Sequence, residues 1–211
     1  MRKTMTAYLG GLGPAEIEAW STRIAEYLTA TAEWRAADTV LCFLSMPHEL
    51  DTTPLIAAAR AWKKTVAVPL MEAGEIRFVV LPPGAGGHRR ELAALRREPA
   101  ALARDRWGIP VPDPAWPAID LARAARPLVA APGLAFDRLG NRLGRGKGYY
   151  DRYLKRARAG ARDLIALGIC FSGQVLEEVP HGADDQRVDG VVTEKGRVEG
   201  PDAATPAASS T

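Results

Sequence analysis

The sequence predicts a single α/β domain built around a mostly parallel sheet. A length of 211 residues fits one compact domain. Apolar residues make up 47% and charged residues 25% of the chain, the usual balance of a globular protein with its own core. Short apolar runs of strand character alternate with segments of helical periodicity, the rhythm of strands joined by helices.

The first predicted elements are a helix, a strand and a second helix. Residues 14–30 open with proline, which suits a first helical turn, and their apolar residues recur at helical spacing. Residues 39–44 form a wholly apolar run, typical of a strand covered on both faces. The second helix opens at Pro54, with Thr52 or Thr53 as its cap.

The remaining elements follow the same logic up to residue 199, where the predicted domain ends. A brief strand at 65–68 is expected to stop at Pro69, and a helix is expected from Gly148 to about Ala159. Further strands are predicted at 76–81, 127–131, 164–171 and 188–193. Residues 82–126 are interpreted as a surface helix to about Arg97 and a proline-rich loop around Trp107 and Trp116, and residues 200–211 as a disordered tail.

Charge and cysteine usage limit the classes of function. A net charge of +3 suits a small phosphate-bearing ligand and does not require nucleic acid. No apolar run reaches the length that spans a membrane, so we expect no membrane partner. Cys42 and Cys170 lie in apolar surroundings and are predicted to be buried thiols, which favours a reducing, cytoplasmic location.

One segment carries the features of a phosphate site. Gly144, Gly146 and Gly148 alternate with cationic residues between a predicted strand and a predicted helix. Alternating glycines allow close approach and turn successive N–H groups toward an anion, and the helix start adds its positive dipole end. Arg142, Arg145 and Lys147 are the cations, and Asp151 follows in the first helical turn, where a carboxylate can hold magnesium beside phosphate oxygens.

Other interpretations of this segment are a solvated basic turn and a loop that touches RNA. The glycine spacing and the following carboxylate count against both. The segment is not a Walker A loop, which wants a glycine where Asn141 stands and Ser or Thr where Gly148 stands. It is not a dinucleotide fingerprint either, since the glycines run G-x-G-x-G.

Residues 142–151, Arg-Leu-Gly-Arg-Gly-Lys-Gly-Tyr-Tyr-Asp, with Pro-Gly-Leu-Ala-Phe-Asp at 132–137, resemble the signature of the 5-formyltetrahydrofolate cyclo-ligase family. Three further segments resemble that family in the same order: Leu-Ser-Met-Pro-His-Glu at 44–49, Trp-Gly-Ile-Pro at 107–110, and the C-terminal block from Asp185 to Glu194. The likeness covers about residues 1–195.

The resemblance implies a three-layer α/β sandwich of the NagB/RpiA/CoA transferase-like kind. It implies a monomeric enzyme that joins 5-formyltetrahydrofolate and ATP, with Mg²⁺, to give 5,10-methenyltetrahydrofolate, ADP and phosphate. An N-formyl group is a poor electrophile with a poor leaving oxygen, and transfer of the γ-phosphoryl group to that oxygen solves both difficulties. Catalysis then rests mostly on positioning and charge stabilisation.

The resemblance also implies roles for individual residues. Arg145 and Lys147 are expected to act as catalytic cations beside the transferring phosphate, and Asp151 and Asp185 as magnesium ligands. Leu44, Glu49, Trp107 and Tyr149 are expected to contact folate. The expected ATP contacts are Arg2, Lys3, Arg142, Leu143, Gly144, Arg145, Gly146, Lys147, Gly148, Tyr149 and Tyr150.

The N-terminus departs from the family's pattern, which begins with a lysine and an arginine directed at ATP phosphates. Aligning the first helix puts that arginine at Arg2 and leaves the lysine before Met1. We therefore expect an upstream start, substitution by Lys3, or weaker phosphate binding.

Two other functions remain as alternatives. The first is a non-catalytic nucleotide- or RNA-binding protein on the same scaffold, since a fold alone does not fix function. Asp151 and Asp185 argue against it, because carboxylates beside phosphate bring nothing to an RNA binder. The second is an unrelated phosphotransferase that uses the glycine loop, which leaves Glu49 and Trp107 without a purpose.

Overall fold

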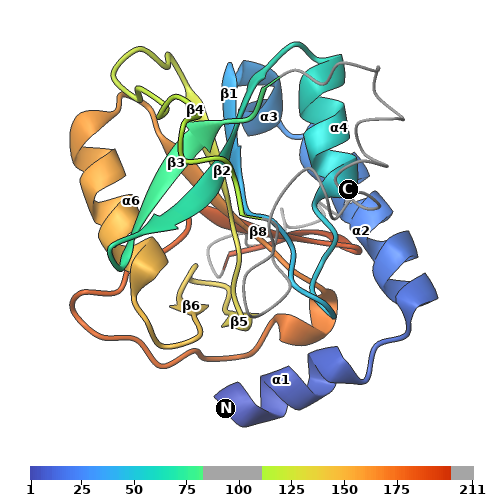
Figure 1. The fold of residues 1–211 in the computed structure, drawn as a ribbon. Helices are drawn as coiled ribbons and strands as arrows, with labels where there is room; N and C mark the ends of the chain where they lie inside the picture. The colour runs from blue at the N-terminus through green and yellow to red at the C-terminus, as the bar shows by residue number, and fades with distance from the viewer. Residues whose placement is uncertain (83–110, 201–211) are drawn as a thin grey trace, which may run out of the picture.

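The computed structural model describes residues 1–82 and 111–200. Its main sheet has seven strands and a separate hairpin has two (Figure 1). The strands of the main sheet are β1 (Thr39–Cys42), β2 (Thr65–Glu72), β3 (Glu75–Val80), β4 (Pro127–Ala131), β7 (Ile165–Ile169), β8 (Gly190–Thr193) and β9 (Gly196–Val198). The hairpin strands are β5 (Ala135–Phe136) and β6 (Arg142–Leu143). The helices are α1 (Arg2–Gly10), α2 (Pro14–Thr29), α3 (Ala32–Ala36), α4 (Thr53–Ala61), α6 (Tyr149–Gly160) and a short 3-10 turn at Ser172–Gln174.

The main sheet is mostly parallel, as the sequence predicts. Its strand order is β3-β2-β1-β4-β7-β8-β9. The five inner strands pair in parallel, and only the edge strands β3 and β9 run antiparallel to their neighbours. Parallel neighbours end at the same edge of the sheet, so the loops after β1, β4 and β7 meet there.

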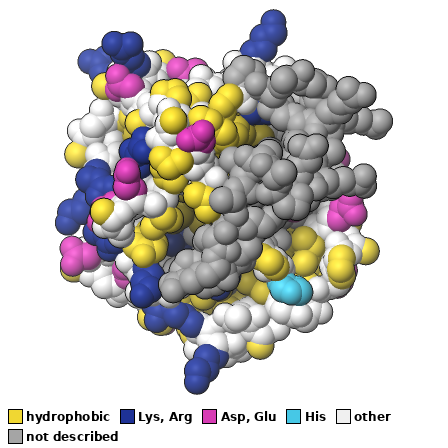
Figure 2. All heavy atoms as spheres, in the orientation of Figure 1, with side chains coloured by type: hydrophobic (Ala, Val, Ile, Leu, Met, Phe, Trp, Pro, Cys, Tyr) yellow, Lys and Arg dark blue, Asp and Glu magenta, His cyan; other side chains and the backbone are white. Residues whose placement is uncertain are grey.

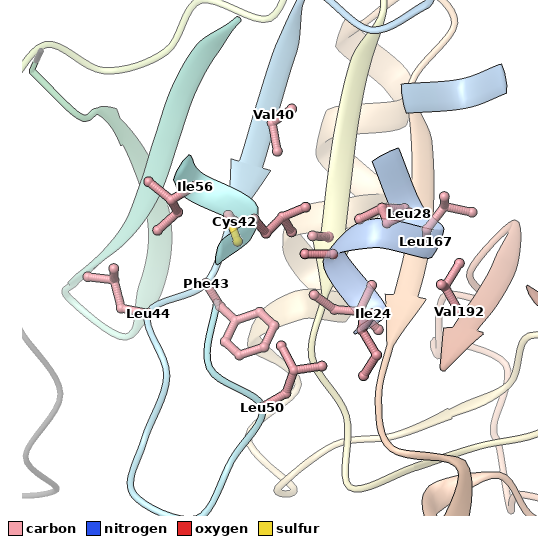
Figure 3. Close-up of a cluster of buried hydrophobic side chains, with 14 of the residues drawn as sticks. Ile24, Leu28, Val40, Cys42, Phe43, Leu44, Leu50, Ile56, Leu167 and Val192 are labelled. Atoms are coloured by element: carbon pink, nitrogen blue, oxygen red, sulfur yellow. The ribbon is translucent and has the colours of Figure 1, made fainter. Parts of the chain in front are cut away.

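Alternate residues of each inner strand face opposite layers, which makes the molecule a three-layer sandwich. In β1, Val40 and Cys42 join the core that includes Ile24, Leu28 and Ile56 of α2 and α4 (Figure 3). Leu41 faces the other way, into the core that includes Tyr153, Leu154 and Ala157 of α6. Helices therefore cover both faces, with α6 on one side and α2 and α4 on the other (Figure 1).

The expected stop at Pro69 is wrong, because β2 continues to Glu72. Beyond Ala67, β2 no longer pairs with β1 and lies beside β3 only. Proline lacks an N–H, so it is tolerated where one side of a strand has no partner. The carbonyl of Phe78, opposite Pro69, points away from β2 and accepts a hydrogen bond from the Ile119 N–H.

The start of α4 is close to its predicted place, but its cap differs. Thr52 occupies the N-cap position without capping, because its hydroxyl donates to the Phe43 carbonyl at 2.8 Å. A carboxylate oxygen of Asp51 accepts the Thr53 N–H at 2.9 Å instead. The loop between β1 and α4 is thereby tied back to the end of the strand.

Six short elements are absent from the sequence prediction: α1, α3, β5, β6, the 3-10 turn and β9. Each is short or has a sparse apolar face; α1, for example, buries only Met5 and Leu9. The predicted surface helix to Arg97, Trp107 and the tail from 201 onward lie outside the described residues. In the described part of the chain, no helix combines the length and the apolar character needed to cross a bilayer.

Candidate active site

The candidate site lies where two loops leave the carboxyl ends of neighbouring parallel strands. The chain from Phe43 to Thr52 follows β1, and the chain from Pro132 to Gly148 follows β4 (Figure 1). The second loop contains the β5–β6 hairpin and leads into α6. This is the edge at which open α/β sheets bind their ligands.

A buried carboxylate shapes the turn that precedes the glycine loop. Asp137 is only 1% exposed. One of its oxygens accepts the N–H groups of Leu139 and Asn141 at 2.9 Å each, and the other accepts the Asn141 side-chain amide at 2.8 Å and the Val179 N–H at 3.1 Å. Four donors satisfy the charge in place of water. The sequence assigned Asp137 no role, although it lies in the quoted motif.

The glycine loop has the backbone of an anion-binding nest. Gly146 and Gly148 adopt φ angles of 93° and 64°, in the left-handed region that favours glycine. Gly148 is also the N-cap residue of α6, so free N–H groups of the first helical turn lie next to the loop. Arg145 and Lys147 are exposed between the glycines. The segment predicted to bind phosphate therefore forms a glycine turn that leads directly into α6.

Arg142 lies beneath this loop in a buried ion pair. One guanidinium nitrogen donates to an Asp151 carboxylate oxygen at 2.8 Å, and the two side chains are 4% and 16% exposed. Its guanidinium carbon is 5.6 Å from the centroid of the Tyr150 ring. In this arrangement Arg142 supports the loop from within, while Arg145 and Lys147 occupy its exposed side.

The two predicted magnesium ligands are brought close through the backbone. The carboxylate oxygen of Asp151 that pairs with Arg142 also accepts the Gln186 N–H at 3.2 Å, and Gln186 directly follows Asp185. Asp185 is exposed, and its carboxylate accepts the Gly182 N–H at 2.7 Å. Within residues 1–82 and 111–200, no three His, Cys, Asp or Glu side chains gather into a site that could hold a metal alone. Asp151 and Asp185 carry carboxylates, the donor type that magnesium takes in ones or twos together with phosphate oxygens.

The predicted folate residue Glu49 contacts the predicted phosphate residue Arg145. An Arg145 guanidinium nitrogen donates to one Glu49 oxygen at 2.5 Å, and the other Glu49 oxygen accepts the Met46 N–H at 3.2 Å. Glu49 is 17% exposed and Arg145 45% exposed. The structure thus joins the loop after β1 to the glycine loop.

The other predicted folate residues have different surroundings. Leu44 is buried and belongs to the core cluster that also includes Phe43 and Leu50. Tyr149 is half-buried, with the guanidinium carbon of Arg152 at 5.4 Å from its ring centroid. Trp107 lies outside the described residues.

The N-terminal helix also reaches the glycine loop. The Arg2 guanidinium donates through its Nε to the Gly144 carbonyl at 3.0 Å. A side-chain carbon added at Gly146 would lie 3.7 Å from the same nitrogen. Lys3 is exposed on α1. The structure therefore brings Arg2 into contact with the glycine loop.

Tyr150 lies below the loop. Its hydroxyl is buried and has no hydrogen-bond partner among the described residues, and burial raises the pKa of Tyr150 well above its usual value. Leu143, the remaining predicted ATP contact, is buried in β6.

Comparison with known proteins finds similarity to one family over nearly the whole chain. The profile of the 5-formyltetrahydrofolate cyclo-ligase family matches residues 1–194. A probable 5-formyltetrahydrofolate cyclo-ligase of Schizosaccharomyces pombe is 29% identical over 92% of this chain and 93% of its own length. The 5-formyltetrahydrofolate cyclo-ligase of Escherichia coli is 31% identical over 74% of this chain and 78% of its own length.

Two solved structures are similar to this chain in fold. The 5,10-methenyltetrahydrofolate synthetase of Aquifex aeolicus has a TM-score of 0.71 and 29% identity, covering 97% of this chain and 93% of that one. The synthetase of Mycoplasma pneumoniae has a TM-score of 0.64, and at 17% identity this likeness shows the fold alone. With a family match that spans nearly all of the chain, this protein belongs to the 5-formyltetrahydrofolate cyclo-ligase family.

Proposed function

We propose that the chain converts 5-formyltetrahydrofolate and ATP to 5,10-methenyltetrahydrofolate, ADP and phosphate. The observation that carries the proposal is the contact between the two loops. A left-handed glycine turn at a helix start, suited to a triphosphate, is ion-paired through Arg145 to Glu49 of the neighbouring loop. Two substrates bound on these loops are adjacent, as direct phosphoryl transfer requires.

The reaction follows from the chemistry of the formyl group. The formyl oxygen attacks the γ-phosphorus of ATP, and ADP leaves. The carbon of the O-phosphorylated formyl group is a better electrophile, so N10 attacks it and closes the ring. The oxygen then departs with the phosphoryl group as inorganic phosphate, and the N10 proton is lost.

Each part of the site has a role in this scheme. The N–H groups of the glycine loop hold the phosphates, with Arg2 and Lys3 beside them on α1. Arg145 and Lys147 stabilise the charge that develops on the transferring group. Glu49, Leu44, Tyr149 and Trp107 contact the folate. Arg142 acts indirectly, because its ion pair orients Asp151.

Magnesium belongs to the same proposal. Asp151 and Asp185 would hold it, and the ion would supply positive charge to the phosphate oxygens. Asp151 has one oxygen committed to Arg142 and Gln186, which leaves its other oxygen as the candidate ligand.

We further propose a monomer in a reducing, cytoplasmic setting, which both buried, unpaired cysteines suit.

The test is to mix the purified protein with 5-formyltetrahydrofolate and Mg-ATP and to follow the absorbance of the methenyl product. We expect product only when nucleotide and magnesium are both present, with EDTA and omission of ATP as controls. Product formed at the same rate without ATP, or no product at all, would reject the proposed reaction.

A further inference from the structure

One arginine with no role in the scheme above holds the glycine loop in place from the side. Arg152 lies in the first turn of α6, and all three of its guanidinium nitrogens donate hydrogen bonds. They reach the Lys147 carbonyl at 3.0 Å, the Gly74 carbonyl at 3.0 Å and a Glu75 carboxylate oxygen at 2.7 Å. The guanidinium carbon also lies 5.4 Å from the centroid of the Tyr149 ring.

The contact with Lys147 sets the direction of a peptide that would bind phosphate. In a trans peptide the carbonyl of one residue and the N–H of the next point in opposite directions. A donor that holds the Lys147 carbonyl therefore directs the Gly148 N–H away from Arg152. An anion-binding nest needs its N–H groups turned to one side, so this orientation decides whether the nest is formed.

The same guanidinium fills the space beside Gly148. Gly148 has a φ of 64°, and a side-chain carbon added there would lie 3.1 Å from the Arg152 Nη1. The left-handed turn, the missing side chain and the arginine thus fit together as one unit at the start of α6.

The other contacts of Arg152 lie on the sheet, so that Arg152 acts as a clamp between the β2–β3 connection and the glycine loop. Gly74 lies in the turn between β2 and β3, and Glu75 is the first residue of β3. β3 packs against α6, with the Phe78 and Tyr153 ring centroids 4.7 Å apart. Arg156 donates to the second oxygen of Glu75. Lys and Arg side chains gather along the side of the molecule that carries α6 (Figure 2). Of the two arginines on Glu75, only Arg152 reaches the glycine loop.

We propose that Arg152 is a positioning residue that sets the affinity for ATP without touching either substrate. It connects the rigid β2–β3 turn to the Lys147–Gly148 peptide and keeps that peptide in the orientation that receives a phosphate. This inference rests on the proposed function of the glycine loop as the triphosphate site.

The test compares two neighbouring arginines that share Glu75. For Arg152→Gln we expect the dissociation constant of a non-hydrolysable ATP analogue, measured by calorimetry without folate, to rise about tenfold, the order seen when a supporting contact is lost. The KM for ATP rises with it, while the KM for 5-formyltetrahydrofolate stays within about twofold. Arg156→Gln is the matched control, and we expect it to leave ATP affinity unchanged.

Two further variants separate positioning from general destabilisation. Arg152→Lys keeps one charged donor and is expected to recover part of the ATP affinity. Glu75→Gln leaves Arg152 in place without its charged anchor and is expected to weaken ATP binding by less than Arg152→Gln. Melting temperatures of the Arg152 and Arg156 variants are expected to fall by similar, small amounts.

The outcomes separate this inference from the reaction itself. If the wild-type protein cyclises folate with ATP and Arg152→Gln binds the analogue as the wild type does, the clamp is rejected and the reaction stands. The clamp is also rejected if Arg156→Gln weakens ATP binding equally, or if both substrates lose affinity together. If the wild type forms no ATP-dependent product, the proposed reaction fails first.

Discussion

At the scale of single residues, the exposed cations of the glycine loop have different surroundings. Arg145 is engaged by Glu49, whereas Lys147 is exposed and its backbone carbonyl is held by Arg152. We therefore propose that the Lys147 side chain acts on the ligand and contributes little to the stability of the fold.

We predict that Lys147→Ala lowers kcat about 10²–10³-fold, the usual loss when one group that stabilises transition-state charge is removed. Exposed side chains contribute within about 0.5 kcal/mol to stability, so the melting temperature is expected to stay within about 2 °C of the wild type. Steady-state kinetics and a thermal melt check both points. Near-normal turnover would remove Lys147 from the catalytic group.

Asp151 is expected to have two effects, on stability and on magnesium. Asp151→Asn leaves Arg142 as an unpaired buried charge, so we expect the free energy of unfolding to fall by on the order of 3 kcal/mol. We also expect the magnesium concentration for half-maximal rate to rise.

Asp185→Asn is the matched control, because Asp185 is exposed. It should shift the magnesium titration with little change in stability. Denaturant unfolding and magnesium titrations of both variants check this. An unchanged magnesium titration in both would argue against metal ligation by either residue.

The sequence could name most site residues because they lie in contiguous motifs. It could not pair Glu49 with Arg145, which are 96 positions apart and meet only because β1 and β4 are neighbours in the sheet. The burial of Arg142 against Asp151 was equally hidden, since an arginine in a basic glycine-rich run looks exposed. Arg152 has one local signal, a position in the first turn of the helix that follows Gly148, but its anchor at the start of β3 is 77 positions away.

At the scale of elements, the β5–β6 turn fixes where the glycine loop begins. Gly140 has a φ of 81°, and a side-chain carbon added there would lie 2.2 Å from the Val188 carbonyl oxygen. The Gly140 carbonyl in turn accepts the Val188 N–H at 2.9 Å. The turn therefore docks directly on the chain that precedes β8.

We predict that Gly140→Ala lowers the free energy of unfolding by more than about 2 kcal/mol, since the left-handed backbone alone costs about 1–2 kcal/mol and the clash adds to it. Gly160→Ala, at the end of α6, is the control, because nothing lies within 4 Å of an added carbon there. Chemical unfolding of the two variants decides the matter. Equal free energies of unfolding in both variants would show that the β5–β6 turn accommodates the added carbon without loss of stability.

Elements were predictable where a local pattern was strong. The periodicity of α2 and the apolar run of β4 gave their bounds to within a residue. Pro69 misled because proline is harmful only where its missing N–H is needed, and pairing with β1 ends before it. The short helices α1 and α3 depend on packing against the rest of the molecule, which no local pattern records.

At the scale of the whole molecule, each of the two core layers contains one buried cysteine, whose reactivity can show when that layer opens. Cys42 belongs to the layer under α2 and α4, and Cys170 to the layer under α6. Burial raises the pKa of the Cys42 thiol to about 12 and raises the pKa of Cys170 as well. Both thiols are therefore protonated and shielded near neutral pH, and native protein should be inert to thiol reagents.

We predict that both thiols become reactive together as urea is added, because a single domain opens both layers in one transition. Mass spectrometry of pulse-alkylated protein at each urea concentration gives the fraction labelled at each cysteine. Coincident midpoints, equal to the midpoint from circular dichroism, are expected. Labelling of one cysteine well before the other would contradict a single cooperative domain.

We propose that the glycine loop delivers the terminal phosphoryl group of ATP to the formyl oxygen of the folate. This transfer is tested most directly with 5-formyltetrahydrofolate that carries ¹⁸O in its formyl group. Mass spectrometry of the products from the purified protein with Mg-ATP should find one ¹⁸O atom in each inorganic phosphate released. Unlabelled phosphate, formed while the methenyl product accumulates and ¹⁸O passes to water, would contradict the account.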